Sequence, residues 1–225
     1  MPPLAATKVC VFDAYGTLFN VHSAASAKRA RLGPFADALS ESWRSRQLQY
    51  TWLRALMGQY VNFWHVTEQA LDYAMETVKL DDRALRQELL DLYRQLKAYP
   101  EVEPMLESLR ARGRKTAILS NGSPTMLANA VDAAGLRERL DAVLSADSVK
   151  TFKPDPRVYN LTIEAFECEP AEVAFVTANS WDAFGAAGFG YAVIWLNRMS
   201  APEERLPGQL AAQVKSLADV APLFA

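Results

Sequence analysis

The chain has 225 residues, of which 50% are hydrophobic and 22% are charged, and its formal net charge is −2. This length and composition suit one large α/β domain, or a domain with an insertion, and exclude a disordered chain. Acids and bases are spread along the chain, so nothing indicates a nucleic-acid surface, and no apolar run approaches the roughly 18 residues that span a bilayer. We therefore expect a small-molecule partner, with neither nucleic acid nor a membrane.

The two cysteines, Cys10 and Cys168, are far apart in the sequence. Cys10 lies in an apolar run, where a buried thiol is the ordinary interpretation. Such a pair forms neither a metal motif nor a convincing disulfide framework. The segment Met1–Leu4 lacks the charged start and the long apolar stretch of a secretory signal. A reducing cytoplasm is the expected location.

The first predicted element is Lys8–Phe12, a short apolar run that ends at Asp13 and is typical of a buried strand. From about Ser23 to Ala98 the amino-acid composition changes, because glycine is scarce and strong helix formers dominate. Leucines recur there at helical spacing, and strand-like runs are absent. This block predicts a helical domain inserted after the first strand.

Beyond this block, helical and strand-like segments alternate. The strand-like runs are Thr116–Leu119, Ala142–Ser145, Val173–Val176 and Ala192–Trp195. Ser123-Pro124 and Asp155-Pro156 offer a capping side chain and a first-turn proline to two helices between them. The alternation indicates parallel βαβ units in a doubly wound sheet. We therefore predict a Rossmann-like α/β core in residues 1–20 and 99–225, with a helical cap domain in residues 21–98.

Polar residues gather where the predicted strands end or in the loops between them. They are Asp13, Thr17, Ser120, Asn121, Lys153, Thr177, Asn179 and Asp182. Ligands of open parallel sheets bind outside the carboxyl ends of the strands. These side chains are therefore expected to lie together around one cleft, the mouth, at that edge of the sheet. Each one alone also fits an ordinary turn or helix cap. Their combination favours a site.

The chemistry of this mouth centres on a carboxylate. Asp13 in a strand-end turn can act as a covalent nucleophile when it is aligned and partly desolvated. Lys153 can pair with Asp13 and favour its ionised form, and Asp182 can orient or activate water. Ser120 and the backbone N–H groups near Ala14 can hold a substrate carboxylate.

Four segments, in order, resemble the motifs of the haloacid dehalogenase superfamily. They are Phe12–Phe19, Ser120–Gly122, Lys153-Pro154 and Asn179–Asp182. The resemblance covers essentially the whole chain and places a helical cap between the first two motifs. Four ordered motifs are far more specific than any single one.

Two positions depart from the magnesium-dependent phosphatases of that superfamily. Those enzymes carry a general-acid aspartate two residues after the nucleophile, where this chain has Tyr15. They also carry an acidic magnesium ligand in the fourth motif, where this chain has the neutral Asn179. Both departures match the L-2-haloacid dehalogenase branch. The segments Ser42–Leu53 and Tyr60–Phe63 also resemble cap segments of that branch.

This resemblance implies hydrolysis of short L-2-haloalkanoic acids. Asp13 would displace halide from C2 with inversion, and water would then cleave the ester to give a D-2-hydroxy acid, without a metal or organic cofactor. Arg44 would accept the halide, assisted by Asn121. Further implied site residues are Tyr15, Leu48, Phe63 and Trp181 around the substrate, Tyr159 as an active-site tyrosine, and Thr177, where relatives often have serine. The resemblance also implies a homodimer, as is common in this family.

Two other functions stay open from the sequence. A magnesium-dependent phosphatase on the same fold would lose its activity with a chelator. A non-catalytic binding protein would keep its biological effect after the substitution Asp13→Asn. The halogen, the chain length of the acid and the physiological substrate are not encoded in any motif, and neither is the ability to release fluoride.

Overall fold

The computed structural model describes residues 3–224. Its sheet has six strands in the order β3-β2-β1-β4-β5-β6, and every neighbouring pair is parallel. The strands are β1 (Val9–Phe12), β2 (Lys115–Ser120), β3 (Ala142–Ser145), β4 (Val173–Thr177), β5 (Ala192–Leu196) and β6 (Ala212–Val214). The predicted doubly wound parallel sheet is confirmed, and β6 is a strand that the sequence pattern did not indicate.

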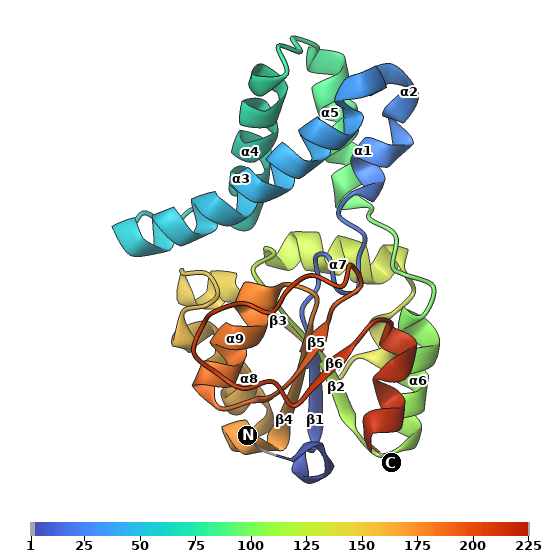
Figure 1. Cartoon of the computed structure of the whole chain (residues 1–225), viewed down its shortest axis with the longest axis vertical. Helices are drawn as coiled ribbons and strands as arrows, with labels where there is room; N and C mark the ends of the chain where they lie inside the picture. The colour runs from blue at the N-terminus through green and yellow to red at the C-terminus, as the bar shows by residue number, and fades with distance from the viewer. Residues whose placement is uncertain (1–2, 225) are drawn as a thin grey trace.

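Successive residues of the central strand β1 point to opposite faces of the sheet. Val9 and Val11 pack on the side of α8 (Pro156–Phe166) and α9 (Ser180–Phe189). Cys10 and Phe12 pack on the side of α6 (Val102–Ala111) and α7 (Pro124–Ala133). Figure 1 shows α8 and α9 on one side of the strands and α6 on the other. Because both faces of β1 are buried, this strand appears in the sequence as a continuous apolar run.

Two of the core helices begin as their sequences predict. The Ser123 hydroxyl accepts a hydrogen bond from the backbone N–H of Met126, and the Asp155 carboxylate accepts one from that of Arg157. A proline occupies the first turn of each helix, where its missing N–H is not needed. The Ser123 cap starts α7 just beyond the end of β2, so the N-terminus of that helix borders the carboxyl edge of the sheet.

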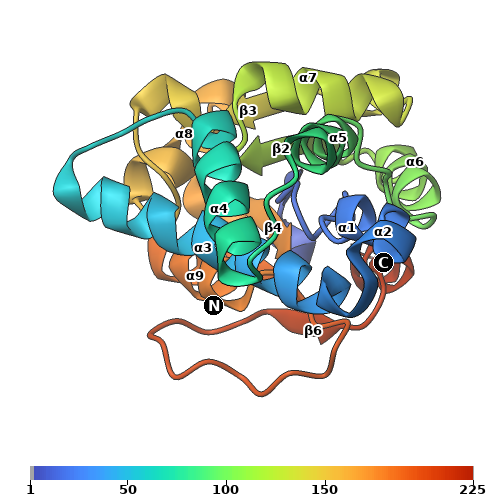
Figure 2. The same ribbon diagram turned by 90° about the horizontal axis from the view of Figure 1, so that it is seen from above.

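The segment of residues 21–98, between β1 and β2, is helical. The helices are α1 (Ser23–Ala27), α2 (Arg29–Leu32), α3 (Ala36–Met57), α4 (Phe63–Thr77) and α5 (Arg83–Arg94). They gather at one end of the molecule in Figure 1, and Figure 2 shows α3 and α4 from above the sheet. The two connections to the sheet run side by side, with the Tyr99 N–H donating to the Leu18 carbonyl at 2.9 Å. The exact domain boundaries stay a prediction.

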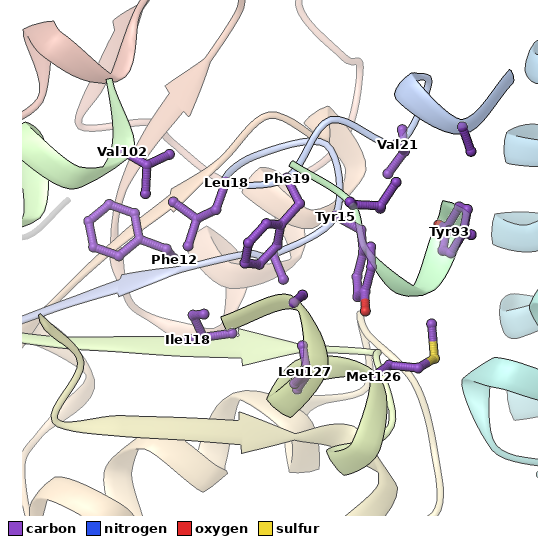
Figure 3. Close-up of a cluster of buried hydrophobic side chains, with 14 of the residues drawn as sticks. Phe12, Tyr15, Leu18, Phe19, Val21, Tyr93, Val102, Ile118, Met126 and Leu127 are labelled. Atoms are coloured by element: carbon purple, nitrogen blue, oxygen red, sulfur yellow. The ribbon is translucent and has the colours of Figure 1, made fainter. Parts of the chain in front are cut away.

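An apolar cluster joins the cap helices to the sheet. Figure 3 shows it extending from Phe12 and Ile118 in the strands to Tyr15 and to Tyr93 of α5. The rings of Tyr15 and Tyr93 are stacked, with centroids 5.9 Å apart. Gly122 makes this packing possible, because a Cβ there would lie 2.7 Å from the Tyr15 ring. The turn that follows β1 is therefore fixed from both domains.

The helices of residues 3–224 are too short or too polar for any of them to cross a membrane.

Candidate active site

Asp13 follows β1 directly, and its carboxylate is almost enclosed, with 6% of the residue exposed. One oxygen, Oδ1, accepts from Lys153 Nζ at 3.2 Å. The other, Oδ2, accepts from Asn179 Nδ2 at 2.7 Å and from the Thr17 hydroxyl at 3.1 Å. Three donors from three separate segments hold this carboxylate in one orientation, as a nucleophile requires.

Behind Asp13, Lys153 links it to a second acid. Lys153 is 1% exposed, and its Nζ lies 2.9 Å from Oδ2 of the fully buried Asp182. The Tyr159 hydroxyl donates to the other oxygen of Asp182 at 2.8 Å. Burial raises the pKa of Asp182 to about 6, outweighing the opposite effect of the Lys153 ammonium. Burial and the Asp182 carboxylate also raise the pKa of Tyr159, so its hydroxyl stays protonated and donates.

Tyr159 is therefore placed behind Asp182. It lies on α8, is fully buried, and its ring packs edge-on against Phe175 of β4. The side chain fixes the orientation of the Asp182 carboxylate. Its assignment as a catalytic residue stays a prediction, and the geometry gives it a positioning task.

Arg44 reaches the site from α3 of the cap. Its Nη2 donates to the Tyr15 carbonyl and to Asn179 Oδ1, both at 3.1 Å. The amide of Asn179 thus bridges Asp13 and Arg44, donating to the carboxylate and accepting from the guanidinium. Gly16, with φ +93, passes under Arg44, since a Cβ there would lie 3.9 Å from Nη2. Segments that are more than a hundred residues apart in the sequence meet at this one amide.

Two threonines support the turn after β4. The Thr17 hydroxyl, which donates to Asp13, accepts from the Ala178 backbone N–H at 2.8 Å. The Thr177 hydroxyl accepts from the backbone N–H of Asn179 at 3.1 Å, and Thr177 is fully buried. Thr177 therefore acts on the site through Asn179. Its predicted contact with substrate stays untested.

Ser120 is the last residue of β2, Asn121 follows it, and both are buried. The Ser120 hydroxyl accepts from the Gly122 backbone N–H at 3.1 Å, which leaves its own hydrogen available for another acceptor. The Asn121 carbonyl oxygen accepts from the backbone N–H of Lys153 at 2.9 Å. Asn121 therefore holds the segment that carries Lys153, and its amide nitrogen is directed away from that contact.

The predicted apolar wall has two parts. Phe63, at the start of α4, lies with its ring centroid 5.8 Å from that of Tyr15. Trp181 meets Trp52 of α3 edge to face, with centroids 5.3 Å apart, and Leu48 is partly buried on the same helix. A hollow of about 540 Å³ between cap and core is lined by both tryptophans and by Lys153, Phe152, Pro154 and Leu206. A larger hollow of about 660 Å³ between α3 and α4 contains none of the predicted site residues.

Sequence reasoning missed three residues that the structure places around this site. Gln47 accepts from Arg44, Trp52 packs on Trp181, and Gly185 lies against Tyr159. The spacing of Arg44 and Gln47, three apart on one helix, was a readable signal. The other two contacts depend on tertiary packing, which leaves no local pattern.

The acidic groups of the site are committed to the lysine. Asp13 and Asp182 both contact the Lys153 ammonium. Within residues 3–224, no group of three or more His, Cys, Asp or Glu side chains is arranged to hold a metal ion. The donor set therefore differs from the oxygen-rich set that magnesium needs.

Comparison with known proteins agrees with this geometry. The family model of haloacid dehalogenase-like hydrolases matches residues 7–190. The (S)-2-haloacid dehalogenase 4A of Burkholderia cepacia is 45% identical over 219 residues, which cover 97% of this chain and 95% of that protein. The chain belongs to the haloacid dehalogenase-like hydrolase family.

Solved structures of dehalogenases share the whole architecture. The crystal structure of one dehalogenase matches with a TM-score of 0.95 at 45% identity, covering 96% of each chain. The L-2-haloacid dehalogenase from Xanthobacter autotrophicus, with chloropropionic acid covalently bound, matches with a TM-score of 0.89 at 37% identity. That match covers 96% of this chain and 98% of that one. The predicted resemblance to the L-2-haloacid dehalogenase branch is confirmed.

Helix α9 packs closely against Tyr159 in this haloacid dehalogenase-like hydrolase, and a substitution at Gly185 tests that packing. A Cβ on Gly185 would lie 2.7 Å from the Tyr159 hydroxyl and 2.7 Å from Pro154 Cβ. We expect Gly185→Ala to lower the free energy of unfolding by about 1–3 kcal/mol, because the added methyl group overpacks the site. It should also reduce turnover, since Tyr159 must move away from Asp182. Urea unfolding and initial rates measure the two effects.

Gly188 is the matched control on the same helix, because nothing lies within 4 Å of a Cβ placed there. Gly188→Ala should keep full activity and gain a little stability, since alanine favours the helix. Equal stability and activity of the two variants would contradict the packing described for Tyr159.

Proposed function

We propose that this chain hydrolyses short L-2-haloalkanoic acids to D-2-hydroxy acids through an ester of Asp13. The observation that carries this proposal is the Asn179 amide, which lies 2.7 Å from the Asp13 carboxylate and 3.1 Å from Arg44. Asp13 can act as the nucleophile, and Arg44 is a fixed cation on the other side of the same amide. This arrangement suits a displacement reaction that releases an anion. The (S)-2-haloacid dehalogenases that resemble the chain along nearly its whole length support the same reaction.

In the first step, a carboxylate oxygen of Asp13 attacks C2 of the substrate from the side opposite the halogen. The carbon–halogen bond breaks as the carbon–oxygen bond forms, so C2 is inverted. The departing halide takes the bonding pair and is received by Arg44 and by the Asn121 amide. Enclosure by the apolar walls strengthens this electrostatic stabilisation, because water does not screen it.

In the second step, water attacks the carbonyl carbon of the Asp13 ester. Asp182 accepts the proton of that water as a general base. Lys153 Nζ, 3.2 Å from Asp13 Oδ1, stabilises the negative charge that develops on the carbonyl oxygen. The ester bond then breaks at the carbonyl, and Asp182 returns its proton to the leaving oxygen, so the new hydroxyl oxygen of the product comes from Asp13. The Asp13 carboxyl that remains releases its proton to solvent. Neither step needs a metal or organic cofactor.

The substrate is oriented at both of its ends. The Ser120 hydroxyl, whose oxygen accepts from Gly122, has its hydrogen available for the substrate carboxylate, together with backbone N–H groups after Asp13. The alkyl group faces Leu48, Phe63 and Trp181. This arrangement presents C2 to Asp13 and the halogen to Arg44, which sets the stereochemical preference.

We also propose a homodimer that works in a reducing cytoplasm. Leu53, Leu56 and Met57 near the end of α3 are 45%, 86% and 68% exposed, which suits a covered surface. Cys10 and Cys168 are free thiols, which suits a reducing compartment. Sedimentation velocity of the purified chain tests the dimer, and a monomer mass would reject it.

The reaction is tested directly by halide release. We expect the purified protein to release chloride from L-2-chloropropionate in the presence of a chelator, and Asp13→Asn to release none, because a neutral amide cannot form the ester. Chloride is followed by ion chromatography. Activity that disappears with the chelator and returns with magnesium would contradict the proposal and favour a phosphatase-like metal site.

The raised pKa of Asp182 predicts the pH dependence of ester hydrolysis. Only the ionised carboxylate can accept a proton, so the rate of ester breakdown should fall as the pH drops through the pKa of Asp182, which burial raises above that of an exposed aspartate. The hydrogen bond from Tyr159 lowers that pKa, so Tyr159→Phe should move the acid limb to higher pH. Stopped-flow rates of ester breakdown across the pH range measure both curves. An acid limb that is identical in the two proteins would reject Asp182 as the base.

A further inference from the structure

A buried glutamine of the cap lies directly behind Arg44. Gln47 is on the same helix α3 and is 1% exposed. Its Oε1 accepts from Arg44 Nη1 at 2.8 Å, and its Nε2 donates to the Thr67 hydroxyl at 2.7 Å. Buried amides are found where both of their ends are paired, and this one joins the guanidinium to α4.

The contacts fix which way the amide of Gln47 points. The single hydrogen of the Thr67 hydroxyl is donated to the Phe63 carbonyl at 2.8 Å, so toward Gln47 the hydroxyl can only accept. Nε2 must therefore face Thr67, and Oε1 must face Arg44, which can only donate. The Tyr93 hydroxyl is a further hydrogen-bond partner of the Gln47 amide and lies 3.0 Å from Nε2. Thr67 and Tyr93 are both buried, so water does not compete for these contacts.

The charge of Gln47 matters as much as its position. Arg44 donates to three oxygens, those of Gln47, Tyr15 and Asn179, and all three are neutral. A carboxylate in any of these places would form an ion pair with the guanidinium and cancel its positive field. With neutral partners, Arg44 is held in place and keeps its whole charge for an incoming anion.

We infer that Gln47 is a positioning residue that holds Arg44 toward the departing halide without neutralising it. This inference rests on the proposed function, since it concerns how the halide is received. It assigns to a residue outside the substrate pocket a specific effect on carbon–halogen cleavage. A poorer leaving group depends more on the cation, so the effect should be larger for chloride than for bromide.

The same helix supplies a matched control. Arg46 and Gln49 repeat the spacing of Arg44 and Gln47, and Arg46 Nη1 donates to Gln49 Oε1. That pair is on the exposed side of α3 and takes no part in the site. Gln49→Glu therefore makes the same chemical change as Gln47→Glu without touching Arg44.

The experiment measures halide release in a single turnover, with enzyme in excess, from L-2-bromopropionate and from L-2-chloropropionate. We expect Gln47→Glu to slow chloride release by about 10-fold or more, as loss of one electrostatic contact to a transition state does. Bromide release should slow less, so the bromide-to-chloride rate ratio should rise severalfold. Gln49→Glu should match the wild type with both substrates. A structural defect alone would slow both substrates equally and leave the ratio unchanged.

Thermal unfolding shows whether Gln47→Glu is folded. Should it not fold, Thr67→Val decides the question, because it removes the acceptor that orients the amide and should raise the same ratio by a smaller factor. An unchanged ratio in the folded variant, with an active wild type, would overturn the assignment of Gln47 alone. A wild type that releases neither halide would overturn the proposed function as well.

Discussion

The Lys153 ammonium lies between two buried carboxylates, and the arrangement of the site depends on this contact. Its Nζ is 3.2 Å from Asp13 and 2.9 Å from Asp182, and all three side chains are almost without exposure to solvent. Burial of charges is costly, and removal of one partner from such a group costs about 3–5 kcal/mol because a charge is left uncompensated. The three segments that carry these residues are therefore held together by the same charges to which we assign the chemistry.

The core supplies two carboxylates and one ammonium to this site, and the cap supplies a second cation, whose hydrogen bonds go to neutral oxygens. Arg44 joins the group through Asn179 and the Tyr15 carbonyl, so closure of cap on core completes the electrostatics of the site. The stacked rings of Tyr15 and Tyr93 fix the same turn from the cap side. The proposed nucleophile thus comes from the core and the proposed halide-accepting cation from the cap, and their relative position depends on how cap and core pack.

Burial separates the two acids into two roles. Asp13, the proposed nucleophile, is held in one orientation by donors from Lys153, Asn179 and Thr17. Asp182 is wholly enclosed, and burial raises its pKa to about 6, so it is a better base than an exposed aspartate. Tyr159 and Gly185 act behind it, one by a hydrogen bond and the other by the absence of a side chain.

The sequence was informative where chemistry follows local pattern. Apolar runs marked β1 to β5, and the residues just after them marked the carboxyl edge, because parallel strands bring those ends together. The strand β6 was missed, since it has three residues and only one of them is buried. Gln47 resembles a surface residue beside Arg46 and Gln49, and only the fold shows that Gln47 is buried and Gln49 is exposed. Neither the hollow at Trp52 nor the fit of Gly185 could be predicted, because both depend on contacts between distant segments.

The origin of the product's hydroxyl oxygen tests the central claim most directly. The measurement is a single turnover of L-2-chloropropionate, with enzyme in excess, in water labelled with heavy oxygen, followed by mass spectrometry of the lactate and of the peptide that contains Asp13. Attack by Asp13 and hydrolysis at its carbonyl predict unlabelled lactate and one heavy oxygen in the Asp13 carboxylate. Label in the lactate hydroxyl, with none in the peptide, would show that water attacks C2 directly and would contradict the covalent role of Asp13.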